Sequence, residues 1–166
     1  GLVTSIDLHV FEEVCKALRS WQLRNLPTHI ISCNFSQLHF DRKDFPQQLA
    51  EIAARYDVPH ALLEVEITES AIMKNPEAAW MQIIQLKQMG FKTAIDDFGT
   101  GYSALNLLKE LEFDILKLDG SFVSGAAAEG YKSDVILRNI IRMADELYMT
   151  VLCEGLETAG QVERLN

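Results

Sequence analysis

The chain has 166 residues, of which 48% are apolar and 23% are charged, and its formal net charge is −9. This composition suits one globular domain with a sizeable core, and no apolar run is long enough to span a bilayer. The acidic balance and the lack of a Lys/Arg stripe argue against a DNA or RNA polymer as partner, whereas a small anionic ligand can bind if metal ions neutralise the acids.

In chain order, the apolar pattern predicts a helix from Ser5, a strand over 30–36, a helix around Leu49, a strand over 62–68, and a helix that Asn75 caps and Gly90 ends. The second half continues with a strand up to Asp96-Asp97, a helix capped by Ser103, a strand over 115–119, a helix carrying residues 135–147, a strand over 150–154, and a last helix with a Thr158/Gln161 capping box. The buried side of the helix that Gly90 ends holds Ile83 and Leu86, with Trp80 as a further candidate. The apolar residues of the later helix are Val135, Ile136, Ile140, Met143, Ala144 and Leu147.

Alternation of strand and helix is typical of a parallel sheet covered by helices. One face of the predicted strands is apolar: Ile31, Cys33, Phe35, Leu63, Val65, Ile67, Leu116, Leu118, Val151 and Cys153. The other is polar on every strand: Ser32, Asn34, Ser36, Glu64, Glu66, Thr68, Asp96, Lys117, Asp119 and Glu154, with Ala94 and Leu152 among them. A doubly wound sheet is apolar on both faces, whereas a barrel turns its second face into a lumen. We therefore predict an α/β fold in which the parallel strands form a barrel.

The three cysteines, Cys15, Cys33 and Cys153, are far apart, lack CxxC spacing and have apolar neighbours. They favour buried thiols in a reducing compartment over a disulfide framework or a zinc site. We expect a cytoplasmic location, which includes attachment to a membrane protein in the parent chain. Because the chain begins at Gly1 without Met and stops soon after a new helix begins, we expect one domain over 1–166 that is incomplete at both ends.

Residues that can carry chemistry collect at the predicted strand ends, where such barrels build their sites. They are Asn34, Glu66, Asp96, Asp97, Lys117, Asp119 and Glu154. Carboxylate and amide oxygens, without His or Cys, suit Mg²⁺ or Mn²⁺. The carboxylates exceed the need of one Mg²⁺, and a pair of ions roughly 3.5–4 Å apart activates water and clamps a phosphodiester in line. Lys117 would neutralise these acids or hold the attacking water; a buried salt bridge to Glu64 or Asp119 is the alternative.

Five segments resemble, in order and approximate spacing, the motifs of the EAL-domain family of cyclic di-GMP phosphodiesterases. They are Cys33-Asn34-Phe35-Ser36, Glu66-Ile67-Thr68-Glu69-Ser70, the run from Asp96 to Ser103, Lys117-Leu118-Asp119, and Glu154-Gly155-Leu156-Glu157-Thr158. The resemblance implies a modified TIM-type (β/α)8 barrel, of which the chain covers about five central β/α units. It also implies two Mg²⁺ or Mn²⁺ ions and hydrolysis of cyclic di-GMP to linear pGpG in bacterial second-messenger signalling. For such a protein we expect a homodimer and sensory or GGDEF domains in the parent chain.

The resemblance also assigns roles by position. It implies that the metal ligands are Asn34, Glu66, Asp96, Asp97 and Glu154, with Asp96 as the bridge. Lys117 is similar to the lysine that contacts the nucleophilic water, and Glu154 can also serve as base. Glu69 resembles the glutamate that anchors the loop of Phe98, Gly99, Thr100, Gly101, Tyr102 and Ser103. Glu157 resembles a residue that lines the nucleotide site, and Asp119 belongs to the same substrate-binding or loop set. Cys153 stands where the family more often has alanine.

Two alternatives remain open. The family's Glu-Ala-Leu segment, with one more ligand glutamate, would precede Gly1, and a strand with an active-site glutamine would follow Asn166. If the parent chain retains both, we expect an enzyme; if they are degenerate, we expect a receptor that only binds cyclic di-GMP. Argued without the family, an enolase-like barrel could use Mg²⁺ and a lysine to abstract a proton next to a carboxylate, but it would not need the loop from Asp97 to Ser103.

Overall fold

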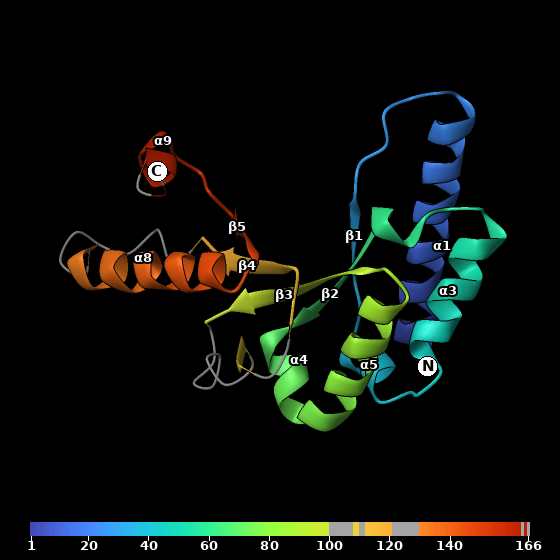
Figure 1. Ribbon diagram of the computed structural model, residues 1–166, viewed down its shortest axis with the longest axis horizontal. Coiled ribbons are helices and arrows are strands. Elements are labelled where there is room, and N and C mark those ends of the chain that lie inside the picture. Colours follow the sequence, from blue (N-terminus) through green and yellow to red (C-terminus); the bar gives the residue numbers. More distant parts are fainter. Residues whose placement is uncertain (100–107, 110–111, 121–129, 164, 166) are drawn as a thin grey trace.

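A computed structural model describes residues 1–99, 108–109, 112–120, 130–163 and 165 of the chain (Figure 1). At its centre lies a five-stranded parallel sheet in the order β1-β2-β3-β4-β5. The strands are β1 (Ile31–Asn34), β2 (Leu63–Thr68), β3 (Lys92–Phe98), β4 (Ile115–Asp119) and β5 (Thr150–Glu154). A doubly wound sheet reverses its strand order at a switch point, and no reversal occurs among these strands. The predicted barrel-type order is therefore confirmed for the part of the chain that the structure describes.

Helices precede, connect and follow the strands. They are α1 (Leu2–Leu23), α2 (Gln37–Phe40), α3 (Phe45–Arg55), the short 3₁₀ helix η1 (His60–Leu62), α4 (Glu69–Lys74), α5 (Pro76–Gln88), α8 (Gly130–Glu146) and α9 (Ala159–Glu163). Of these, α1, α4, α5 and α8 contact the sheet. Figure 1 shows α1, α3 and α5 gathered near one end of the sheet and α8 beside β5 at the other. Of the helix predicted after β3, the structure describes residues 108–109, which are helical, and Leu108 is buried. The predicted cap Ser103 lies outside the described residues.

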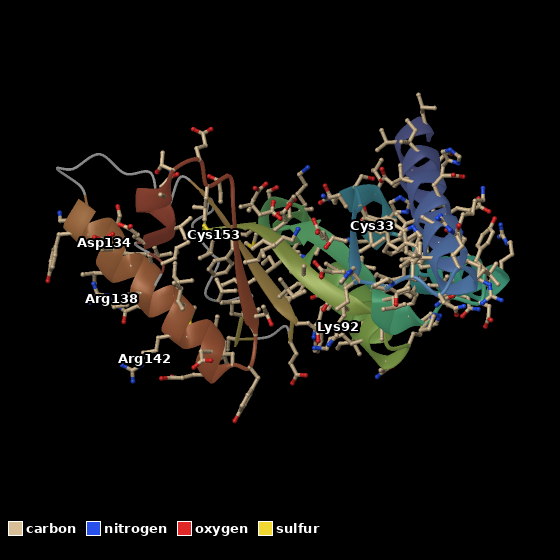
Figure 2. All side chains as sticks on the ribbon, turned by 90° about the horizontal axis from the view of Figure 1, so that it is seen from above. Cys33, Lys92, Asp134, Arg138, Arg142 and Cys153 are labelled. Atoms are coloured by element: carbon tan, nitrogen blue, oxygen red, sulfur yellow. The ribbon has the colours of Figure 1, made fainter. Side chains whose placement is uncertain are left out.

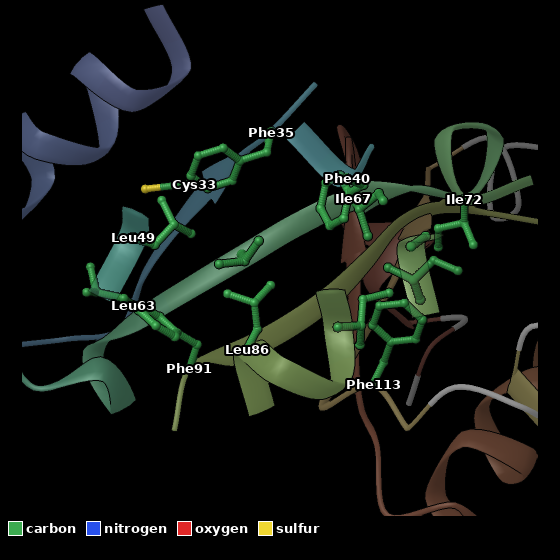
Figure 3. Packing of buried hydrophobic residues seen from close by; sticks show 14 of the residues in the cluster. Cys33, Phe35, Phe40, Leu49, Leu63, Ile67, Ile72, Leu86, Phe91 and Phe113 are labelled. Atoms are coloured by element: carbon green, nitrogen blue, oxygen red, sulfur yellow. The ribbon is translucent and has the colours of Figure 1, made fainter. Parts of the chain in front are cut away.

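The core forms between the helices and the apolar strand face. In α1, Phe11, Cys15 and Leu18 recur at spacings of three and four, which places them on one side of the helix, and all three are fully buried. Figure 3 shows the cluster around β1 and β2, in which strand residues meet residues of α3 and α5; it includes Cys33, Phe35, Leu49, Leu63, Ile67 and Leu86. The period-two face assignment made from the sequence is confirmed for β1 and β2.

Some of the apolar residues of α5 and α8 lie outside the buried faces of these helices. Trp80 is 45% exposed, while Ile83 and Leu86 are buried as predicted. In α8 the buried positions are Leu137 and Ala144, whereas Val135, Ile136 and Leu147 are exposed. Val135 and Ile136 directly precede Leu137 and are rotated about 200° and about 100° away from it, respectively, on a helix of 3.6 residues per turn, so they do not share its buried side. Figure 2 shows Arg138 and Arg142 of the same helix extending into solvent.

The predicted helix ends are mostly confirmed. Gly90 follows α5 with φ of +90°, the left-handed conformation that commonly ends helices. At α9, the backbone N–H of Gln161 donates to Thr158 Oγ1, and Gln161 Oε1 accepts from the backbone N–H of Thr158 at 2.8 Å. Asn75 does precede α5, but its amide donates to Asp41 at 3.0 Å instead of capping the helix.

The cysteines are free thiols, and Cys33 on β1 and Cys153 on β5 lie far apart on the sheet (Figure 2). Burial raises the pKa of Cys15 to about 11 and that of Cys33 to about 12, so both are unreactive at neutral pH. Within the described ranges, none of the helices combines the length and the apolar character needed to cross a membrane.

Candidate functional site

The predicted site residues meet at the edge of the sheet where the parallel strands have their carboxyl ends. Asn34, Asp119 and Glu154 are the last residues of β1, β4 and β5, and Glu66 and Asp96 lie two residues before the ends of β2 and β3. Asn34 is in register with Glu66, and Asp119 is in register with Glu154. Each of the five strands therefore contributes an oxygen-bearing side chain to one edge.

A β-bulge places Asp96 and Asp97 together. Ile95 pairs with Leu116 and Phe98 with Leu118, so two aspartates of β3 face the single residue Lys117 of β4. Asp97 adopts φ of +54°, which aspartate tolerates better than most residues, and its N–H donates to Asp96 Oδ1 at 2.9 Å. The bulge breaks the alternation that would otherwise send adjacent side chains to opposite faces. After the bulge, the side chain of Phe98 is buried in the core and only 1% exposed.

Lys117 is the cation at the centre of this edge. Its Nζ contacts Glu66 Oε1 and lies 2.8 Å from Glu154 Oε1, so it links β4 to β2 and to β5. From the sequence, Glu64 or Asp119 was the alternative salt-bridge partner of Lys117. In the structure, the carboxylates that contact Lys117 are those of Glu66 and Glu154. Burial alone would lower the pKa of Lys117, but its hydrogen bonds to Glu154 and Glu66 outweigh burial and raise it. The lysine is therefore charged across the physiological pH range.

Glu66 and Lys117 lie on β2 and β4, so their contact crosses β3 beside the small residue Ala94. Ala94 is in register with Glu66 on one side and with Ile115 on the other, and it is fully buried. Lys117 follows Ile115 by two residues and thus shares its face. A longer side chain at position 94 would occupy the path of the lysine.

Glu64 lies on the same face as Glu66 and was not predicted as part of the site. It is 5% exposed, and its Oε1 accepts a hydrogen bond from Ser32 Oγ at 2.7 Å. Burial raises the pKa of Glu64, although the bond from Ser32 opposes the shift. The signal that could have identified it is its spacing of two residues from Glu66 on a strand with period two.

Glu69 makes the contact expected of a loop anchor. It is the first residue of α4 and 1% exposed, and its Oε2 accepts a hydrogen bond from the Gly99 backbone N–H at 2.8 Å. Gly99 has φ of +89°, a conformation that favours glycine. The predicted loop residues Thr100, Gly101, Tyr102 and Ser103 lie outside the described residues. Glu157, three residues beyond Glu154, is exposed and precedes α9.

The donor set fits hard divalent cations, because it consists of carboxylate and amide oxygens. Asn34, Asp97 and Glu154 are exposed, so an ion can approach from solvent. Burial raises the pKa of Asp96, with a contribution from the charges of Asp97 and Glu66, and a bound cation would relieve that crowding of negative charge. Within the described ranges, no three His, Cys, Asp or Glu side chains are gathered closely enough to hold a metal ion. Lys117, in contact with both Glu66 and Glu154, neutralises them in this arrangement.

Comparison with known proteins identifies a consistent set of relatives. The family described as EAL domain matches the chain over residues 1–166. The signaling protein YkoW of Bacillus subtilis is 34% identical over 165 residues, which cover 99% of this chain but only 20% of YkoW. The phosphodiesterase MucR of Pseudomonas aeruginosa, solved as a cyclic di-GMP complex, superposes with a TM-score of 0.88 and 32% identity over 99% of this chain and 66% of the MucR chain.

A third similar protein is BlrP1 of Klebsiella pneumoniae, solved as a manganese/cyclic di-GMP complex. It superposes with a TM-score of 0.79 and 25% identity over 93% of this chain and 40% of the BlrP1 chain. The chain thus spans about a fifth of the length of YkoW and two fifths of the BlrP1 chain.

Proposed function

The chain belongs to the EAL domain family, and from that premise we propose that it is part of a metal-dependent phosphodiesterase that hydrolyses cyclic di-GMP to linear pGpG. The observation that carries the proposal is the row of oxygen donors at the carboxyl ends of five adjacent strands, with the charged Lys117 between Glu66 and Glu154. The complexes of MucR and BlrP1 with cyclic di-GMP support the choice of substrate.

In this proposal Asn34, Glu66, Asp96, Asp97 and Glu154 would hold two Mg²⁺ or Mn²⁺ ions. When bound, such a pair supplies an activated water and neutralises charge on the phosphodiester. The manganese in the BlrP1 complex supports a divalent ion of this kind.

During hydrolysis, Glu154 would accept the proton and Lys117 would supply positive charge. The Glu154 side chain is 50% exposed, so its carboxylate can accept a proton from a water that arrives from solvent. Lys117 donates hydrogen bonds to Glu154 and Glu66, which fixes both carboxylates and holds a positive charge next to the position of the reacting water. Glu69 fixes the start of the turn after β3, and thereby the bulge that presents Asp97.

The metal requirement is the first test. Hydrolysis of cyclic di-GMP by the full-length protein is expected to need Mg²⁺ or Mn²⁺ and to be inhibited by Ca²⁺, whose longer and looser coordination misplaces the water. Product formation would be followed by chromatography with each ion and with excess EDTA. Full activity in EDTA would contradict the proposal, and binding of cyclic di-GMP without hydrolysis under any ion would indicate a receptor instead.

Ala94 provides a second test, because its role depends on space alone. Ala94→Leu is expected to displace Lys117 from Glu66 and to lower kcat at least about tenfold, together with the about 1–3 kcal/mol loss of stability typical of an overpacked core. Ala94→Ser, which adds one atom, is the control and should retain activity. Wild-type kcat in the leucine variant would show that Lys117 does not need this path.

The expected homodimer, the sensory or GGDEF domains and the cytoplasmic location remain predictions, as does the incompleteness of the domain over 1–166.

A further inference from the structure

Asp7 of α1 holds the segment that follows β1. Its Oδ2 accepts a hydrogen bond from the Ser36 backbone N–H at 3.0 Å and lies 3.2 Å from His39 Nε2. The His39 side chain is 0% exposed and the Asp7 side chain 17% exposed. A buried polar pair is not required for packing, since apolar residues of similar volume often stabilise a fold as well or better. The Asp7–His39 pair is therefore better explained by the backbone that it positions than by its contribution to packing.

The apolar surroundings of His39 make the burial of its imidazole ring energetically unfavourable. The imidazole packs edge-on against Phe35, with ring centroids 5.4 Å apart, and lies 4.8 Å from the ring of Phe45. Burial lowers the pKa of His39 although Asp7 opposes the shift, so the ring is neutral at pH 7 and donates through Nε2. In the described part of the chain, Nδ1 of His39 has no hydrogen-bond partner. The hydrogen bond to Asp7 is therefore retained although the other ring nitrogen of His39 is buried without a partner among the described residues, which costs free energy.

The backbone that follows Asn34 is held from two sides. The Phe35 N–H donates to the Glu66 carbonyl oxygen at 3.2 Å, so β2 holds one side of the chain as it leaves β1. Asp7 holds the next amide, that of Ser36, from the side of α1. Asn34 itself is exposed, so packing does little to fix its side chain and the backbone on either side determines where it points.

We propose that Asp7 and His39 are positioning residues for Asn34: Asp7 fixes the backbone at Ser36, and His39 orients the Asp7 carboxylate from a rigid aromatic pocket. The consequence for metal binding rests on the proposed function, in which Asn34 is a ligand. The consequence for the backbone does not.

The first experiment measures hydrogen exchange of the full-length protein without added metal. In Asp7→Ala and in His39→Leu, amides of residues 34–36 are expected to exchange several-fold faster than in the wild type, because the Ser36 amide loses its acceptor or that acceptor loses its orientation. In His39→Gln the side-chain amide can still donate to Asp7, so exchange is expected to stay close to wild type. Unchanged exchange in Asp7→Ala would overturn the proposal whether or not the protein is an enzyme.

The second experiment titrates Mg²⁺ against both the melting temperature and the hydrolysis of cyclic di-GMP. Asp7→Ala and His39→Leu are expected to need about tenfold more Mg²⁺ for half-maximal effect, the lower end of the range for residues that orient metal ligands. His39→Gln should restore the wild-type requirement. Ile83→Val is the control for general destabilisation, since it removes a buried methylene in α5, whose main strand contact is β3.

The outcomes separate the two claims. Faster exchange with an unchanged Mg²⁺ requirement would overturn the link from Asp7 to Asn34 as a ligand. A wild-type protein that neither hydrolyses cyclic di-GMP nor is stabilised by Mg²⁺ would refute the proposed function, and the exchange result would still decide whether Asp7 and His39 fix the backbone.

Discussion

Lys117→Met is expected to lower kcat for cyclic di-GMP at least about 10²-fold, the scale of one positioned electrostatic or acid–base group. Methionine keeps the unbranched stem of the side chain and lacks only its terminal ammonium, so the charge and the hydrogen bonds to Glu66 and Glu154 are lost. Stability should also fall, by about 3 kcal/mol in the metal-free protein, because Glu66 is 1% exposed and loses its cation. Steady-state kinetics at saturating Mg²⁺ and denaturant unfolding measure the two effects.

A double variant separates catalysis from stability at this site. Lys117→Met combined with Glu66→Gln removes both charges, so most of the lost stability should return while activity stays low. Lys92→Met is the matched control: Lys92 begins β3 at the opposite end of the sheet, pairs with Asp114 and should retain wild-type kcat. Near-wild-type turnover in Lys117→Met would assign the lysine to structure alone.

Much of the fold could be predicted because strand faces and helix order depend on periodicity. The apolar alternation in β1 and β2 and the position of β4 follow directly from sequence, and the consecutive strand order follows from a polar second face. The face of α8 could not be predicted in the same way. Leu137, Val135 and Ile136 are all apolar, and only contact with the sheet determines which of them is buried.

The site was predicted as a set of residues but not as an arrangement. The sequence placed Asp96 and Asp97 at a strand end, yet the bulge depends on the register with β4, a long-range property. The partners of Lys117 depend on the same register. Glu66 reaches it across β3, beside the small residue Ala94, which periodicity alone does not reveal. Asp7 is distant in sequence from any site motif, and only the structure shows that it contacts Ser36 and His39, which follow β1.

Glu69→Ala is expected to lower kcat at least about tenfold and to raise the Mg²⁺ concentration needed for half-maximal activity, with little change in melting temperature. The Glu69 carboxylate accepts the Gly99 N–H immediately after the bulge, so its loss leaves the left-handed turn at Gly99 without an acceptor. That turn follows Asp97 by two residues, and greater freedom there spreads the positions that Asp97 can take. Glu69→Gln retains an oxygen that can accept this hydrogen bond and should recover most of the activity.

The competing explanation is that Glu69 only interacts with the N-terminus of α4, which is worth roughly 0.3–1 kcal/mol and leaves kinetics alone. Glu77 is the matched control, because it is an exposed acidic residue in the first turn of α5 with no part in the site. If the helix-terminus explanation is right, Glu69→Ala and Glu77→Ala should behave alike, with wild-type Mg²⁺ titration curves. If Glu69 anchors the loop, only its variant should shift the curve, because only Glu69 bonds the backbone that carries Asp97 into the site.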